Sequence, residues 1–180
     1  SAEQGAPVLA ICNTQGATLA RESDAVIYTH AGPEVAVAST KALTAQITAG
    51  YLLGLFLASV RGSTPAAELG AIGLDLLKMP SRVADVIKGS KNIEALGMAM
   101  SDAKSVLFLG RNVGFPVAME GALKLKELAY IHAEGFAAGE LKHGPIALIE
   151  DGQPVIVIVP SPRDADSLHP KVISNIQEIR

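Results

Sequence analysis

Tryptophan is absent from this 180-residue chain, and aromatic residues make up only 4% of it. The apolar share is nevertheless 49%, so the core has to be built from Ala, Val, Leu and Ile. A share of this size is enough for a sizeable buried core. Small aliphatic side chains favour helices that pack closely on a parallel sheet, which indicates an α/β fold.

Cysteine is almost absent as well, since Cys12 is the only one. A single cysteine excludes a disulfide within the chain and is typical of a reducing compartment, so we expect a cytoplasmic protein. Cys12 ends the apolar run Val8–Cys12. This position predicts a small buried side chain, not a catalytic thiol.

Basic stripes and long apolar runs are missing too. The formal net charge is −3, which argues against a nucleic acid as partner. The longest apolar stretch, Ala49 to Val60, is twelve residues long, whereas a bilayer requires about twenty. It therefore predicts a core helix and no membrane span.

Metal and cofactor signatures are also missing. Neither HExxH nor CxxC spacing occurs, and the four histidines are dispersed, so no metal site is expected. Gly110 and Gly114 give GxxxG in place of the GxGxxG of dinucleotide-binding folds, so no nucleotide cofactor is expected. The GxSxG motif of serine hydrolases does not occur either.

Short apolar runs alternate with longer helical segments, which is the pattern of a layered α/β fold. Strands are expected at 7–12, 25–28, 105–110 and 154–159, and helices at 41–60, 66–78, 80–88, 92–103, 116–131 and 168–180. Ser39 and Thr40 are the expected N-cap residues of the first helix. Residues 1–5 resemble the tail of a helix with a glycine stop, so we expect the chain to start inside a fold.

Ionisable residues are densest in the middle of the 116–131 segment, from Glu120 to Glu127. At about 100° per residue, a helix places Glu120, Lys124 and Glu127 on one face. The alternative is a solvated face with ordinary Glu–Lys pairing at i,i+4. Residues 130–145 are rich in Gly, Ala, His and Glu and predict a loop, in which His143 precedes a Gly-Pro turn.

Four segments together resemble the isomerase part of the glutamine:fructose-6-phosphate amidotransferases. They are LAICN (9–13), GPEVAVASTKA (32–42), LFLGR (107–111) and Met119 to Leu148, which includes the run EGALKLKELAYIHAEGF. The resemblance implies the sugar isomerase (SIS) fold, with two three-layer α/β/α lobes around parallel sheets, both truncated here. The implied parts are 1–66 of the first lobe, a helical connection at 67–94, and 95–180 of the second lobe.

The same resemblance implies roles for six residues. Glu127 matches the carboxylate that moves a proton between C1 and C2 of the sugar. His143 matches a histidine that assists ring opening from across a dimer interface. Lys124 and Glu120 match companion residues, and Lys124 would stabilise developing negative charge. Val37 and Ser39 match a loop that contacts the sugar, where a helix N-terminus suits a polar ligand.

The family converts fructose 6-phosphate and glutamine-derived ammonia to glucosamine 6-phosphate, in the hexosamine pathway, without a metal or organic cofactor. The resemblance thus implies a homodimer and a glutaminase domain in the same protein. The family's phosphate loop would precede residue 1 and its substrate-contacting lysine would follow Arg180, so the 180 residues are expected to be inactive alone. Two alternatives stay open: a deglycase for fructosamine phosphates, and a non-catalytic SIS module that senses a sugar phosphate.

Overall fold

The computed structural model describes residues 4–163 and 167–180. Internal contacts divide the chain into two compact units, Ser1–Ser90 and Lys91–Arg180. Each unit is described by itself. The division falls inside the expected helical connection at 67–94, and the lobe boundaries 1–66 and 95–180 stay a prediction. Of the predicted helix tail at 1–5, residues 1–3 lie outside the described part of the chain.

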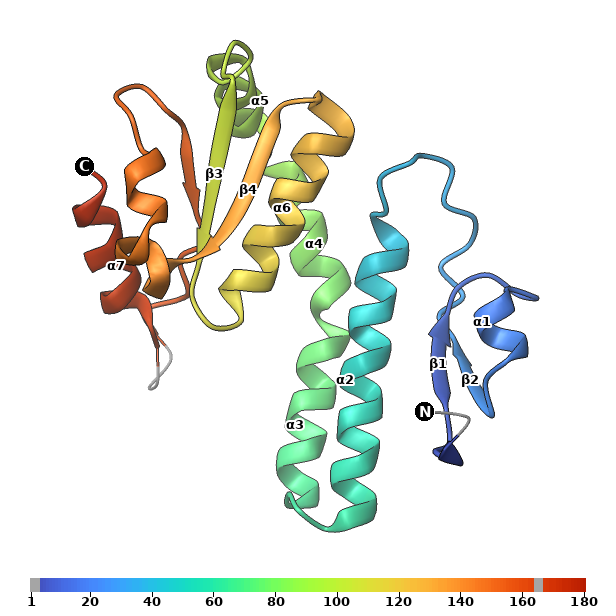
Figure 1. The fold of residues 1–180 in the computed structure, drawn as a ribbon. Helices are drawn as coiled ribbons and strands as arrows, with labels where there is room; N and C mark the ends of the chain where they lie inside the picture. The colour runs from blue at the N-terminus through green and yellow to red at the C-terminus, as the bar shows by residue number, and fades with distance from the viewer. Residues whose placement is uncertain (1–3, 164–166) are drawn as a thin grey trace. The chain divides into compact units, whose positions relative to one another are not determined.

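The first unit begins with a parallel pair of strands, β1 (Leu9–Cys12) and β2 (Ala25–Tyr28), joined through the short helix α1 (Thr18–Arg21). The two strands lie side by side (Figure 1). Their register pairs Leu9 with Ala25 and Cys12 with Tyr28. Both strands fall where apolar runs predict them. Cys12 is buried, as predicted, and its thiol donates to the carbonyl oxygen of Thr14 over 3.3 Å.

Three helices follow: α2 (Lys41–Arg61), α3 (Ala66–Leu77) and α4 (Met79–Lys88). The first two lie side by side and run in opposite directions (Figure 1). Gly62 ends α2 in a left-handed conformation with φ 61°, and Ser63 donates its N–H back to Ala58. The predicted helices at 41–60, 66–78 and 80–88 are thus confirmed to within a residue or two.

The expectation of a buried core helix is wrong for α2 as it stands in this chain. In α2, whose residues are all described, Ala42 and Ala49 are the buried ones, whereas Tyr51, Leu52, Phe56 and Val60 are all more than half exposed. The helix contacts β1 and α3, which cover too little of its surface. The helix is 21 residues long and contains an 18-residue window of mean hydropathy 1.6, so by length and composition alone it could cross a membrane. The twelve-residue apolar run therefore underestimated the apolar segment.

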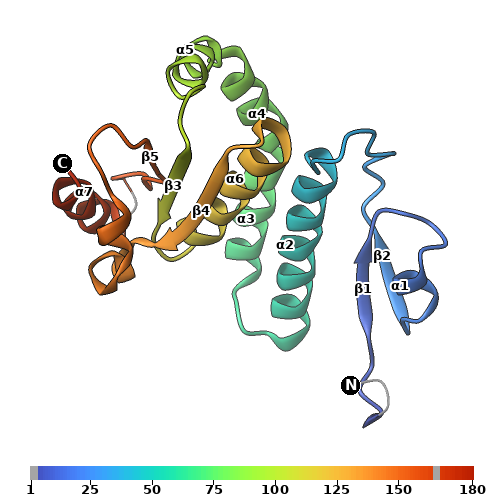
Figure 2. The same cartoon turned by 45° about the horizontal axis from the view of Figure 1, so that its top comes forward.

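The second unit is built on β3 (Ser105–Gly110), which lies between β4 (His132–Ala137) and β5 (Val155–Val157) in a parallel sheet. The helix α5 (Lys91–Ala99) precedes this sheet. The helix α6 (Gly114–Ala129) lies on one face, and two 3₁₀ segments, η2 (Ala138–His143) and η3 (Pro145–Leu148), and α7 (His169–Glu178) complete the unit (Figure 2).

Side chains of β3 are buried on both sides of the sheet. Val106 and Phe108 pack with Ala118 and Ala122 of α6, while Leu109 packs with Leu141 and other residues of the opposite layer. A strand covered on both faces has a continuous apolar sequence, which is why SVLFLG was predictable. The parallel α/β fold class of the second unit is confirmed.

The prediction of a loop over 130–145 is wrong for its first half, because 132–137 forms β4. Its register with β3 pairs Ser105 with His132 and Gly110 with Ala137. His132 and Glu134 are exposed, whereas Ala133 and Gly135 turn toward α6. Polar residues on one face and very small ones on the other leave no apolar run to detect.

Two glycines allow α6 to approach the sheet. A Cβ atom at Gly110 would lie 2.0 Å from the carbonyl oxygen of Gly114, and one at Gly135 would lie 2.9 Å from the Cα atom of Met119. Both neighbours are backbone atoms, which cannot rotate away as a side chain can. The path of the chain from β3 into α6, and the packing of β4 on α6, therefore depend on these two positions.

We predict that Gly110→Ala lowers the free energy of unfolding by about 2 kcal/mol or more, because the added methyl group overlaps backbone. Gly97→Ala in α5 is the matched control, since nothing lies within 4 Å of its Cβ position. It should be neutral, or stabilising by about 0.5 kcal/mol. Urea unfolding curves provide the comparison, and equal midpoints for the two variants would contradict the close approach.

Candidate active site

The helix α6 carries the densest group of predicted site residues. It begins after the turn at 110–113, where Gly114 and Phe115 donate their N–H groups to Arg111 and Asn112 over 2.9 Å. It ends at Tyr130, which adopts a left-handed conformation with φ 57°. Ala118 and Ala122 are buried against the sheet. The rotation of α6 about its axis is therefore fixed by its contact with β3 and β4.

Lys124 lies between two carboxylates on this helix. Its Nζ atom is 2.6 Å from Oε2 of Glu127 and 3.2 Å from Oε1 of Glu120. The prediction that these three residues share one face is confirmed. Within the part of the chain that the structure describes, Lys124 alone hydrogen-bonds the Glu127 carboxylate, through Oε2.

Partial burial distinguishes this group from an ordinary surface pair. The side chains of Lys124, Glu127 and Glu120 are 23%, 24% and 32% exposed. The Lys78–Asp75 pair, joined over 2.8 Å, has both side chains 61% exposed. The sequence left a solvated face with i,i+4 pairing open as the alternative. The structure contains that pairing, between Lys124 and Glu120, on a face that is only partly exposed, so the choice between a site and a surface ion pair stays a prediction.

The surroundings raise the pKa of Lys124 above its ordinary value. The hydrogen bond to Glu127 is the largest cause, burial opposes it, and the bond and charge of Glu120 add to it. Because the folded-state pKa is raised, the stabilising contribution is fully present below the ordinary lysine pKa. It is lost as pH rises through the higher folded value. Lys124 is therefore an ammonium at neutral pH and cannot serve there as a base.

His143 lies elsewhere in the same unit, at the end of η2. Leu141 is fully buried and anchors this segment, while His143 itself is exposed and precedes Gly144, whose φ is 142°. Among the described residues, no hydrogen bond joins His143 to the Glu120–Lys124–Glu127 group. Within the unit, the structure thus presents the imidazole outward, apart from the carboxylates.

Val37 and Ser39 belong to the first unit, in the loop between β2 and α2. Val37 is 91% exposed, whereas the neighbouring Ala38 is buried and fixes the loop. Ser39 is half-buried. Because the two units are described separately, the structure gives no distance between this loop and α6.

The prediction that Ser39 and Thr40 are the N-cap residues of α2 is confirmed in position for Thr40, but the expected side-chain capping bond is not formed. Neither side chain caps the helix; Oε2 of Glu34 accepts the N–H groups of Thr40 (3.0 Å) and Ala42 (3.1 Å). The expectation that this helix N-terminus suits a polar ligand stays a prediction, and a carboxylate of the same chain already holds those two amides. Glu34 was missed since local capping rules do not extend to a residue six positions before the cap.

Asn13 is the second residue that the sequence did not indicate. It follows β1 and bonds the other end of the same loop, donating from Nδ2 to the carbonyl oxygen of Gly32 over 2.7 Å. A polar residue directly after a buried parallel strand is a signal that could have identified it.

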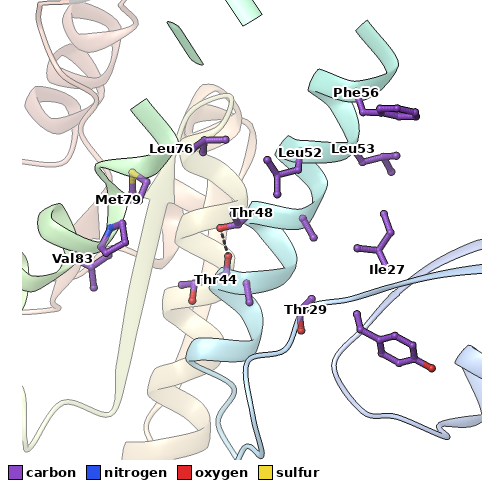
Figure 3. A pocket seen from close by; sticks show the side chains of 14 residues that line it. Ile27, Thr29, Thr44, Thr48, Leu52, Leu53, Phe56, Leu76, Met79 and Val83 are labelled. Atoms are coloured by element: carbon purple, nitrogen blue, oxygen red, sulfur yellow. Dashed lines mark hydrogen bonds between the residues drawn. The ribbon is translucent and has the colours of Figure 1, made fainter. Parts of the chain in front are cut away.

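The first unit also contains an apolar groove of about 660 Å³ (Figure 3). It is lined by residues of β2, α2, α3 and α4, among them Ile27, Leu52, Phe56 and Val83. Its polar side chains are Tyr28 and three threonines, of which Thr48 donates to the carbonyl oxygen of Thr44 over 2.9 Å. None of the predicted site residues lines this groove. Over 4–163 and 167–180, no three His, Cys, Asp or Glu side chains are grouped to hold a metal ion.

Comparison with known proteins gives a consistent set of similarities. The SIS domain family matches residues 1–56 and 99–170. The glutamine–fructose-6-phosphate aminotransferases [isomerizing] of Corynebacterium efficiens and Corynebacterium glutamicum are 70% and 69% identical over 178 residues. These matches cover 99% of this chain and 29% of either relative, so the chain spans less than a third of their length.

The fold is also similar to that of a solved structure. The C-terminal domain of glucosamine-fructose-6-phosphate aminotransferase from Francisella tularensis superposes with a TM-score of 0.89 at 40% identity. That match covers 95% of this chain and 47% of the Francisella chain.

We predict that Lys124 reacts more slowly with an amine-acylating reagent than Lys126, because its ammonium is bonded to two carboxylates while Lys126 is exposed on the same helix. Mass spectrometry after brief labelling at pH 9 measures both rates in one sample. Glu127→Gln should accelerate labelling at Lys124 and leave Lys126 unchanged. Equal rates in the unmodified protein would contradict the ion-pair geometry.

Proposed function

The chain belongs to the SIS domain family, and on this premise we propose that it supplies the isomerase part of a glutamine–fructose-6-phosphate aminotransferase. The proposed reaction joins ammonia from glutamine to fructose 6-phosphate and yields glucosamine 6-phosphate, the entry step of amino-sugar synthesis. The observation that carries this proposal is the partly buried group in which Lys124 lies between Glu120 and Glu127. The names of relatives that are 70% and 69% identical over this chain support it.

Glu127 is the proposed base. Once ammonia has replaced the C2 oxygen of the open sugar to give an imine, the C1 hydrogens become acidic. A carboxylate removes a proton from C1 and returns it at C2, leaving an aldehyde at C1 and an amine at C2. Oε2 of Glu127 is bonded to Lys124, so Oε1 is the oxygen available for this transfer. Lys124 stabilises the negative charge that develops between the two steps.

His143 is the proposed group for ring opening, acting on the site of a second subunit in a homodimer. Two features support this assignment: the imidazole is exposed, and it is not bonded to the carboxylates of its own α6 in the described structure. Val37 and Ser39 are the proposed sugar contacts from the first unit. The glutaminase, the phosphate-binding loop and the remaining sugar contacts lie in other parts of the protein, so we propose that residues 1–180 are inactive alone.

We further propose that α2 faces protein, in a cytoplasmic enzyme, and not lipid. The SIS domain family matches residues 1–56, which include most of α2. More than half of the Francisella chain lies outside the match to this one, so such a fold has additional chain to cover the exposed apolar side chains.

Glu127→Gln should reduce glucosamine 6-phosphate formation at least about 100-fold, because an amide cannot accept the proton. The assay requires a protein of the relatives' full length that carries this chain. Glutamine hydrolysis should persist, since it uses a separate domain. Glu94→Gln on α5 is the matched control and should leave both activities unchanged. Normal hexosamine formation by Glu127→Gln would exclude Glu127 as the base.

Mixing two inactive variants tests the shared site. In a dimer that combines Glu127→Gln with His143→Asn subunits, one of the two sites keeps both an intact Glu127 and an intact His143. Random reassociation should therefore restore about one quarter of the unmodified activity. If each subunit used its own histidine, every site would carry one defect and no activity would return.

A further inference from the structure

The loop that carries Val37 and Ser39 is held by polar bonds at both ends. At its start, Oδ1 of Asn13 accepts from the Thr29 hydroxyl and from the Ala31 amide, each over 2.9 Å. At its end, the Glu34 carboxylate accepts hydrogen bonds from Ser39, Thr40 and Ala42. Between these two fixed points, Ala38 is buried and Val37 projects into solvent. The loop is thus built to present a few groups outward in a set position.

Glu34 determines which way the Ser39 hydroxyl bonds. Its Oε2 atom lies 3.2 Å from Oγ of Ser39 and also accepts the amides of Thr40 and Ala42. A carboxylate only accepts hydrogen bonds, so the single hydroxyl hydrogen of Ser39 is directed to Glu34. The serine oxygen then has lone pairs left and no hydrogen. Toward a ligand, Ser39 is an acceptor.

We propose that Glu34 is a positioning residue that makes Ser39 a hydrogen-bond acceptor for a hydroxyl or amino group of the sugar, and that it keeps the sugar's phosphate away from the α2 N-terminus. The inference rests on the proposed function and deepens it, because it specifies which part of the hexose phosphate this loop recognises. A phosphate would need donors. The amides of Thr40 and Ala42, which would supply them, already bond a negative charge.

The ionisation of Glu34 supports this role. The amides of Thr40 and Ala42 lower the pKa of Glu34 below its ordinary value, and the Ser39 bond and the charge of Lys41 act in the same direction, against partial burial. A lowered folded-state pKa means that the carboxylate is negative throughout the neutral range. The arrangement is therefore present under the conditions in which a metabolic enzyme works.

A double-mutant cycle tests the proposal in a protein of the relatives' full length. Glu34→Ala and Ser39→Ala should each raise the KM for fructose 6-phosphate about tenfold, since each removes the same oriented bond. The KM of the double variant should be no higher than that of the single variant with the higher KM. Glu34→Gln keeps an acceptor oxygen in place of Oε2 and should recover most of the loss. Glu68→Gln, an exposed glutamate in the first turn of α3, is the matched control.

Inhibition by inorganic phosphate separates the two halves of the sugar. Glu34→Ala should leave the inhibition constant of inorganic phosphate unchanged or lower it, because the α2 amides become free. A rise in that inhibition constant in parallel with KM would overturn the proposal. So would a double variant whose increase in KM equals the product of the increases in the two single variants, Glu34→Ala and Ser39→Ala. If the unmodified protein neither bound nor turned over fructose 6-phosphate, the proposed function would fail first. If the unmodified protein turned over fructose 6-phosphate normally but the KM effects of the two substitutions multiplied, this inference alone would be overturned.

Discussion

The contact between α6 and its sheet is the constraint on which the second unit depends. Gly110 lets the chain turn from β3 into α6, and Gly135 lets β4 pass the backbone of Met119. Ala118 and Ala122 then lie fully against the strands. Because two residues along a helix turn it by about 200°, Glu120 and Lys124 point away from this contact. Tight packing on one side of α6 thus fixes the direction of the charged group on the other.

Strands covered on both faces and helices with clear ends were predictable from the sequence, because burial and capping leave local patterns. SVLFLG gave β3 and the apolar AVIY gave β2, each at its correct bounds. β4 was not predictable, since His132 and Glu134 face outward and Ala133 and Gly135 are too small to register as apolar. The exposure of α2 was not predictable either. An apolar sequence predicts that a helix packs against other apolar surface, but it does not show whether that surface lies within this chain.

The candidate site divides in the same way. The helical repeat was sufficient to place Glu120, Lys124 and Glu127 on one face. The structure was needed to find that their side chains are one-quarter to one-third exposed. The hydrogen bonds of Glu34 with Ser39, Thr40 and Ala42 depend on the path of the loop, which the buried Ala38 and the Asn13 bonds determine. No local rule links a glutamate to amides six and eight residues later. Long-range polar bonds of this kind need the fold before they can be found.

The charges on α6 also limit what each residue can do in the proposed reaction. A lysine with a raised pKa keeps its proton at neutral pH, so Lys124 can stabilise charge but cannot remove a proton. The bond from Lys124 to Oε2 directs one oxygen of Glu127 and leaves the other oxygen for the sugar. Since this face of α6 turns away from its own sheet, a hexose bound there has to be enclosed by residues from other elements.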